Sequence, residues 1–353
     1  MVPEFRGTIR IIFDMRIVSV LPLIAAIAGL AFHSEAALAQ SDREQSLLAG
    51  AKKEGEVVVY TSLIAEDLTA LSQAFEKKYG VKVQGWRASS EKVVQRALTE
   101  ARANRHAADV VETNGPELES LYREKILQQF KSPHLPDLMP QAVQSHGYWV
   151  GTRIAMFVQT YNTNVVKKEE VPKRYADLAD PRWKGRLGIE AEDQDWFAMV
   201  VKELGEEQGL RLFREISRVN GFSVRKGHTL LAGLVASGEV PFALTTYSHG
   251  SEKMKQRGAP VEWYAIEPAI GRANGIALLR SLPHPNAAAL FADFVLSVEG
   301  QKILEHGGYV PANLKVGNRA QKLPLKFVDP AVILDESDKW KKLWDEIVLK
   351  AAK

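Results

Sequence analysis

Cysteine is absent from the 353 residues of this chain. Its absence excludes disulfide bonds, thiol catalysis, zinc bound by cysteine and a lipid-modified N-terminal cysteine. A chain of this length can be held together by its own core, and 46% hydrophobic residues are ordinary for a globular protein. The formal net charge is only +3 and no basic stripe carries stacking aromatics, so we expect no nucleic-acid partner.

Local catalytic motifs are also missing. The chain has no Gly-x-Ser-x-Gly elbow, no Walker loop and no His-Glu-x-x-His, and Gly185–Gly188 lacks dinucleotide-binding spacing. No repeat, low-complexity tract or later transmembrane stretch interrupts the chain. A binding protein without a cofactor is the simpler interpretation. An enzyme that uses His249 or Asp193 remains the alternative, because catalytic residues need not be neighbours in sequence.

The N-terminus has the pattern of a secretory signal. An apolar run from Ile17 to Phe32 follows Met15-Arg16, and the small residues of Ala37-Leu38-Ala39 stand before Gln40. We expect translation to start at Met15 and cleavage to follow Ala39, so that residues 1–39 are removed. Without a cysteine to carry lipid, the predicted location is the periplasm, free of a lipid anchor.

The segment Trp149–Asn164 predicts a long strand that crosses between two lobes. Its odd-numbered residues Arg153, Phe157 and Tyr161 share one face, and the turn-prone Asn162-Thr163-Asn164 ends it. An ordinary core strand is the alternative. If the segment does cross, Tyr161 is a candidate ligand residue.

A repeated unit precedes this strand: a short apolar strand, a polar tip and an amphipathic helix. It recurs from Glu56, from Val81 and from Ala108. Apolar strands joined through helices predict a parallel sheet covered on both faces, with ligands at the carboxyl ends of the strands. The candidate ligand residues are therefore the polar tips, which helix capping alone could also explain: Thr61, Ser62, Ser89, Ser90 and Asn114.

Three further segments offer polar or charged tips. Glu192, Asp193 and Asp195 begin a helix, where they either complement its dipole or bind an amine or a hard metal ion. Residues 225–229 place positive side chains before a helix, which suggests an anion site at His228 and Thr229. Residues 240–249 predict a buried strand with a polar end, and its candidate ligand residues are Thr246, Tyr247 and Ser248.

The chain resembles the periplasmic solute-binding proteins of ABC importers with the type II fold, in the branch that contains ferric-ion-binding proteins. The motifs that carry this resemblance span about 54–313: EGEVVVYTSL, Tyr161-Asn162-Thr163, Pro172-x₅-Leu178-x₂-Pro181-x-Trp183-Lys184-Gly185, Gly238–Leu244, His284–Ala289, Glu299-Gly300-Gln301 and Gly308–Pro311. The resemblance implies two doubly wound α/β lobes joined by crossing strands (the type II periplasmic-binding-protein fold), which close on a small solute and dock on a membrane permease.

The ferric ligand pattern of that family is incomplete in this chain. Ferric relatives place two adjacent tyrosines where Tyr247-Ser248-His249 stands, and a histidine where Thr61-Ser62-Leu63 stands. Only Tyr161 and Tyr247, with Glu112 as a third donor, could then bind Fe³⁺. We therefore expect a small anionic solute slightly ahead of Fe³⁺ or an iron complex, which would be cargo and not a cofactor.

The predicted division is 40–160 plus 265–353 for lobe 1 and 161–264 for lobe 2. In it, a final helix that carries Trp340 and Trp344 packs against a lobe. The predicted function is the substrate-binding component of an ABC transporter, a monomer that delivers its solute to the inner-membrane permease. The alternatives are a receptor for polyamines or other cationic amines, an enzyme on the same fold, and a partner that presents ligand to a membrane sensor.

Overall fold

The computed structural model describes residues 42–129, 131–317 and 324–350. The predicted signal peptide lies outside these residues. Residues 47–353 form one compact unit, separate from residues 1–46, whose described part is helical. Within the described ranges, no helix is long and apolar enough to cross a membrane.

The compact unit contains a mixed sheet with the strand order β2-β1-β3-β10-β5-β8-β6-β7. Four short strands pair off this path, β4 and β12 with β10, and β9 and β11 with β5. The bounds are β1 (Glu56–Thr61), β2 (Lys82–Arg87), β3 (Val110–Asn114), β4 (Leu127–Gln128), β5 (Trp149–Asn162), β6 (Leu187–Glu190), β7 (Ser223–Arg225), β8 (Phe242–Tyr247), β9 (Val261–Tyr264), β10 (Ala269–Leu279), β11 (Val310–Pro311) and β12 (Leu325–Phe327).

The first hydrophobic core surrounds the parallel strands β1, β2 and β3. The helix between β1 and β2 buries the apolar side chains of Leu71, Phe75 and Tyr79. Their four-residue spacing predicts this, because it places them on one face of a helix. The helices that contribute to this core are α2 (Ala65–Tyr79), α3 (Ser90–Arg102), α4 (Gly115–Arg123), α9 (Pro285–Leu296) and α10 (Val298–His306).

The second core surrounds β6 and β8 and is rich in aromatic residues. Phe197 packs against Phe213 with ring centroids 5.1 Å apart and against Trp344 at 5.6 Å. The helices on this side are α5 (Gln194–Glu203), α6 (Glu206–Asn220), α7 (His228–Ser237), α8 (Ser248–Gln256) and α12 (Ser337–Trp344). Helix α11 (Pro330–Asp335) packs against α4 of the first core and contributes Ile333 to the second.

The C-terminal helix α12 corrects one part of the predicted domain division. Residues 265–353 were expected in lobe 1, but Trp340 and Trp344 are fully buried in the second core. The apolar stripe of this helix was predicted to pack against a lobe, and it does. The sequence of α12 does not determine the lobe against which it packs, because both cores offer apolar surface to an amphipathic helix.

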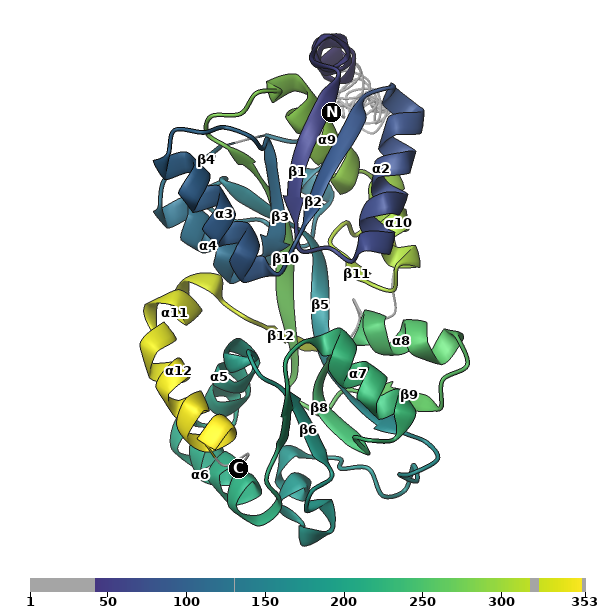
Figure 1. Ribbon diagram of the computed structural model, residues 1–353, viewed down its shortest axis with the longest axis vertical. Helices are drawn as coiled ribbons and strands as arrows, with labels where there is room; N and C mark the ends of the chain where they lie inside the picture. The colour runs from purple at the N-terminus through teal and green to yellow at the C-terminus, as the bar shows by residue number, and fades with distance from the viewer. Residues whose placement is uncertain (1–41, 130, 318–323, 351–353) are drawn as a thin grey trace, which may run out of the picture. The chain divides into compact units, whose positions relative to one another are not determined.

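The strand β5 passes from one core to the other, as predicted (Figure 1). Its Val150 and Ile154 belong to the first core, and its Phe157 belongs to the second. It pairs antiparallel with β10, which makes the same passage in the opposite direction. A bulge at Gly275 interrupts the pairing, and a Cβ there would lie 2.4 Å from the Val150 carbonyl oxygen, so only glycine fits.

The predicted strand at residues 240–249 is shorter in the structure. β8 ends at Tyr247, and helix α8 begins at Ser248. The polar residues Thr245–His249 therefore do not form one row at a strand end. They point in different directions, and only some of them reach the cavity described next.

Candidate functional site

A cavity of about 490 Å³ lies between the two cores and is lined by residues from both. Its size suits a small solute. Two walls face each other across it. The first wall comes from the first core and comprises Ser62, Arg87, Ser89, Ser90, Asn114, Glu117 and Asn274. The second wall comes from the second core and comprises Glu190, Asp193, His228, Thr229, Tyr247 and His249. Arg153 of β5 and Arg272 of β10 line the cavity from the crossing strands.

The first wall consists mainly of small polar groups at helix N-termini. Ser89 and Asn114 are the N-cap residues of α3 and α4, yet neither side chain makes a capping hydrogen bond. The Asn114 carboxamide instead accepts a 2.7 Å hydrogen bond from Asn274 Nδ2 and donates to Glu117 Oε1 at 3.3 Å. Both tips thus line the cavity without capping the backbone of their helices through their side chains.

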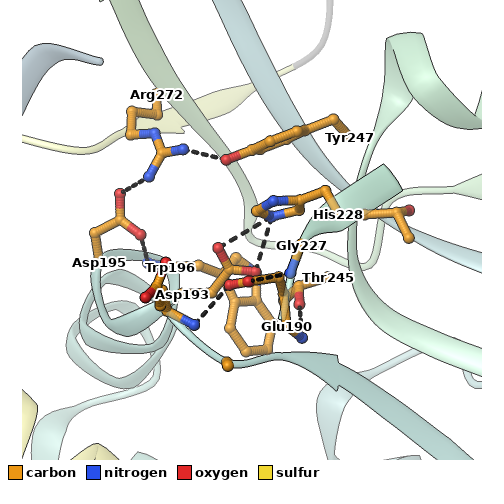
Figure 2. Close-up of polar contacts among 12 residues, drawn as sticks. Glu190, Asp193, Asp195, Trp196, Gly227, His228, Thr245, Tyr247 and Arg272 are labelled. Atoms are coloured by element: carbon orange, nitrogen blue, oxygen red, sulfur yellow. Dashed lines mark hydrogen bonds and ion pairs between the residues drawn. The ribbon is translucent and has the colours of Figure 1, made fainter. Parts of the chain in front are cut away.

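Three groups of the second wall converge on one point: the carboxylates of Glu190 and Asp193 and the imidazole of His228 (Figure 2). Their ligand atoms all lie within 4.8 Å of one another. His228 Nε2 lies 3.1 Å from Asp193 Oδ2. Glu190 and Asp193 are 3% and 1% exposed, so two acidic groups are withdrawn from water side by side.

Backbone groups hold the Glu190 carboxylate. Its two oxygens accept hydrogen bonds from the N–H groups of Gly227 at 2.8 Å and Glu192 at 2.6 Å. Burial nevertheless raises the pKa of Glu190, and the neighbouring Asp193 adds to the rise. This carboxylate is positioned without a compensating cation of its own.

Arg272 connects the crossing strand β10 to the second wall. Its Nη1 donates to Asp195 Oδ2 at 2.7 Å, and its Nη2 donates to the Tyr247 hydroxyl. Burial alone would lower the pKa of Arg272, but Asp195 and Tyr247 raise it, so the guanidinium stays charged. Burial also raises the pKa of Tyr247 well above its usual value, which keeps the phenol neutral.

A stack of rings continues along the cavity from His228 through Tyr247 and His249 to Tyr309. Neighbouring centroids are 3.8, 5.4 and 4.1 Å apart. Burial lowers the pKa of His249 well below its usual value, and Arg153 lowers it further, so this imidazole is neutral. The His249 Nδ1 atom has no hydrogen-bond partner among the described residues.

Arg153 is neutralised behind the cavity. It forms an ion pair with Glu112, and both side chains are buried. Glu112 also accepts a 2.5 Å hydrogen bond from the Thr61 hydroxyl. Glu112, which was considered as a third ferric ligand, is thus already engaged by two protein groups and does not line the cavity.

The structure places eight of the twelve predicted ligand residues along the cavity. They are Ser62, Ser89, Ser90, Asn114, Asp193, His228, Thr229 and Tyr247. The acids of α5 do more than complement a helix dipole, since Asp193 contacts His228 and Asp195 contacts Arg272.

Four predicted residues lie elsewhere, namely Thr61, Tyr161, Thr246 and Ser248, and we correct them. Thr246 Oγ1 bonds to Thr160 Oγ1 at 2.6 Å inside the second core. Tyr161 shares the strand face of Phe157 but stands four residues farther along, about 13 Å deeper, where it contacts Tyr264. Thr61 is fully buried against Glu112, and Ser248 is 4% exposed at the start of α8.

The residues that sequence reasoning missed as ligand candidates are Arg272, Asn274, Arg153, Glu117, Glu190 and Tyr309. Arg272 and Asn274 stand in the apolar segment that becomes β10. Polar residues two apart within a buried strand were the available signal, because such groups need partners.

A family model described as "Bacterial extracellular solute-binding protein" matches residues 107–335. The "Fe(3+)-binding periplasmic protein" of Serratia marcescens is 25% identical over 285 residues, which cover 77% of this chain and 83% of that protein. "Iron uptake protein A1" of Synechocystis sp. is 27% identical over 289 residues, which cover 74% and 79%.

Solved structures share the fold. Iron-bound HitA from Pseudomonas aeruginosa has a TM-score of 0.72 at 24% identity and covers 83% of this chain and 99% of its own. AfuA from Actinobacillus pleuropneumoniae, solved with fructose-6-phosphate, has a TM-score of 0.72 at 22% identity and covers 83% and 98%. At these identities the likeness establishes the two-lobe α/β fold alone. With the matching family model, the chain belongs to the bacterial extracellular solute-binding proteins.

Proposed function

We propose that this protein is the periplasmic receptor of an ABC importer, and that it binds a small solute with a positively charged centre. The solute is bound in the cavity between the lobes and delivered to an inner-membrane permease by a monomeric receptor. Relatives whose names include iron binding and iron uptake support a metal ion or metal complex as the first candidate.

One observation supports a positive charge on the solute. The carboxylates of Glu117, Glu190 and Asp193 line the cavity, and within the described residues none forms an ion pair with Lys or Arg. The buried guanidiniums of Arg153 and Arg272 are already paired with Glu112 and Asp195. Burial raises the pKa of Glu117, as it does that of Glu190. A bound cation would offset this cost, whereas an anion would add to it.

We further propose that the lobes close around β5 and β10. The first lobe would comprise residues 47–155, 272–317 and 324–327, and the second lobe residues 156–271 and 328–350, as the two cores suggest. Turning a mostly open population into a mostly closed one requires about 10⁴-fold preferential binding to the closed state, or about 5.5 kcal/mol. Contacts made only when both walls meet the solute can supply this energy.

Ion pairs between the lobes support such closure. Lys253 Nζ of α8 lies 2.7 Å from Asp67 Oδ1 of α2, and Arg257 Nη2 lies 3.2 Å from Glu66 Oε2. These contacts join helices of the two cores at the edge of the cavity, since Glu66, Lys253 and Arg257 line it. They would form when the lobes approach and separate when the lobes open.

A small anionic solute is the second candidate, with its own observation. Ser89 and Ser90 at the start of α3 and Asn114 at the start of α4 line the first wall, so backbone N–H groups are near the cavity. The unpaired carboxylates across the cavity place this candidate second. A solute with both charges would use both walls.

A thermal-shift screen of the chain from Gln40 tests the proposal. Ferric and divalent metal salts, polyamines, carboxylates and phosphorylated sugars are compared at equal concentration. We expect the largest stabilisation from a metal salt or metal complex, with the compound recovered unchanged. Stabilisation only by anions would overturn the charge of the solute, and chemical turnover of the bound compound would overturn the receptor assignment.

A further inference from the structure

We propose that Glu190, Asp193 and His228 bind a divalent first-row transition-metal ion, such as Mn²⁺, Fe²⁺ or Zn²⁺, as cargo. This inference rests on the proposed function and identifies the positively charged centre of the solute as a divalent metal ion. It also differs from a ferric site built on Tyr161 and Tyr247, because Tyr161 does not line the cavity and the Tyr247 hydroxyl is bound by Arg272.

The geometry of the three groups suits one ion. Two donor atoms on a metal with bonds of about 2.0 to 2.2 Å are at most about 4.4 Å apart. The three donor atoms already lie within 4.8 Å of one another. Side-chain shifts of a few tenths of an ångström would bring them onto an ion, and no backbone movement is needed.

Glu190 and His228 are held in place by neighbouring groups, as metal ligands commonly are. Backbone N–H groups of Gly227 and Glu192 bind the two Glu190 oxygens, and one lone pair remains on each. His228 is stacked on Tyr247 at 3.8 Å. Asp193 begins α5 but does not cap it through its side chain.

An ion pair between His228 and Asp193 alone would leave these groups poorly satisfied. Both Asp193 oxygens are within 3.1 Å of the same His228 nitrogen, so one N–H would serve two buried oxygens. Glu190 would have no cationic partner beyond that shared imidazole. A divalent ion binds all three groups at once and neutralises both carboxylates.

A second observation points to a ligand in the same cavity. His249 and Asn274 line it and are 7% and 6% exposed, and neither His249 Nδ1 nor Asn274 Oδ1 has a partner among the described residues. The carboxamide oxygen is an acceptor, and neutral imidazole has an acceptor nitrogen. A donor on the bound solute, such as water that a metal ion carries into the cavity, would supply the hydrogen bonds that these groups lack.

The donor types select the class of ion. One imidazole nitrogen and two carboxylates suit Mn²⁺, Fe²⁺, Co²⁺ or Zn²⁺. An organic ammonium could use the carboxylates but would gain little from an imidazole whose nitrogen faces the same point. Fe³⁺ would lack a phenolate, and we expect no tyrosinate charge-transfer colour with ferric salts.

Isothermal titration of the chelator-treated chain from Gln40 with Mn²⁺, Zn²⁺ and Co²⁺ tests the site. We expect binding of one equivalent. Asp193→Asn and His228→Gln should each weaken it by more than about 100-fold, and His228→Gln should also change the visible absorption of bound Co²⁺. Glu207→Gln is the matched control: Glu207 is exposed on α6, is paired with Arg211 and does not line the cavity, so the variant should bind as the unmodified chain does.

Equal binding by Asp193→Asn, by His228→Gln and by the unmodified chain would overturn the site. So would the absence of metal binding by a chain that gains thermal stability from another solute, while the receptor function would then stand. Metal-free circular dichroism and melting curves confirm that each variant is folded before its affinity is compared. If no solute of any class stabilises the folded chain, the receptor proposal itself fails.

Discussion

The two walls of the cavity present different kinds of polar group to a solute. The first wall presents mainly hydroxyls and carboxamides, with Arg87 and Glu117 as its charged side chains, and Ser89 and Asn114 make no capping bond. The second wall presents the carboxylates of Glu190 and Asp193, which are almost fully buried, together with the partly buried imidazole of His228. Dipoles at helix termini cost little to bury, whereas unpaired charges cost several kcal/mol. The second wall therefore carries most of the energetic cost, and we expect it to carry most of the selectivity.

Among these variants, the largest change in the free energy of unfolding should come from Arg272, because this β10 residue hydrogen-bonds Tyr247 of the second wall and pairs with Asp195. Arg272→Met leaves Asp195 buried without its cation, so we expect a loss of about 3 to 5 kcal/mol in the free energy of unfolding. Urea denaturation measures it. The double variant Arg272→Met with Asp195→Leu should recover much of the loss; no recovery would show that the pair does not act as a unit.

Acid should weaken the second wall through His249. A histidine whose pKa is lowered by folding stabilises the protein above its unfolded pKa of about 6.5, and this stability is lost as pH falls. We expect a loss of up to about 1.4 kcal/mol per pH unit below 6.5. The measurement is denaturant unfolding between pH 7.5 and pH 5. His249→Asn should flatten this part of the profile, and an unchanged profile would contradict the neutral imidazole.

Glu117 provides the corresponding test on the first wall. Its pKa is raised by burial, so its stabilising contribution is complete below the unfolded pKa and is lost as pH rises through the folded pKa. Glu117→Gln should therefore raise the melting temperature of the ligand-free protein at pH 8 by roughly 2 °C and leave it nearly unchanged at pH 4. A lower melting temperature at pH 8 would mean that this carboxylate is stabilised in the fold.

The smallest effect should come from Ser89. Because its hydroxyl makes no capping bond, Ser89→Ala should change the free energy of unfolding by less than about 0.5 kcal/mol, although loss of an N-cap hydrogen bond typically costs about 1 kcal/mol. Asp329→Ala is the matched control, since Asp329 Oδ1 does cap α11 through the N–H groups of Ala331 and Val332. If both variants lose a similar amount of unfolding free energy, Ser89 stabilises its helix as an ordinary N-cap residue does.

The sequence predicts the cavity residues at junctions between strands and helices better than those inside the crossing strands. Ser62, Ser89 and Asn114 could be found because each follows an apolar strand and precedes a helix, and both features are local. Arg272 could not be assigned in this way: its place in the cavity depends on the antiparallel pairing of β10 with β5, two segments more than a hundred residues apart.

The wrongly assigned residues have the same origin. Tyr161 lies on the expected face of β5, but the distance along the strand from the cavity decides its role, and no local pattern reports that distance. Thr246 was expected at the polar end of a buried strand with its side chain in the cleft, but it bonds to Thr160, 86 residues away in the sequence. Face and element type follow from local spacing, while depth and partner follow from tertiary contacts.

The burial of Trp340 and Trp344 in the second core also bears on how the chain folds during synthesis. Residues emerge from the ribosome N-terminus first, and domains generally fold as units. All fully buried residues of the first core have emerged once Ala312 is out, but the second core begins with Phe157 and must wait for Val348. The half of the protein that bears the buried charges is therefore the last to acquire its full apolar support. A nascent chain whose first 317 residues have emerged from the ribosome would carry a complete set of cavity residues on a second core that lacks its closing helix.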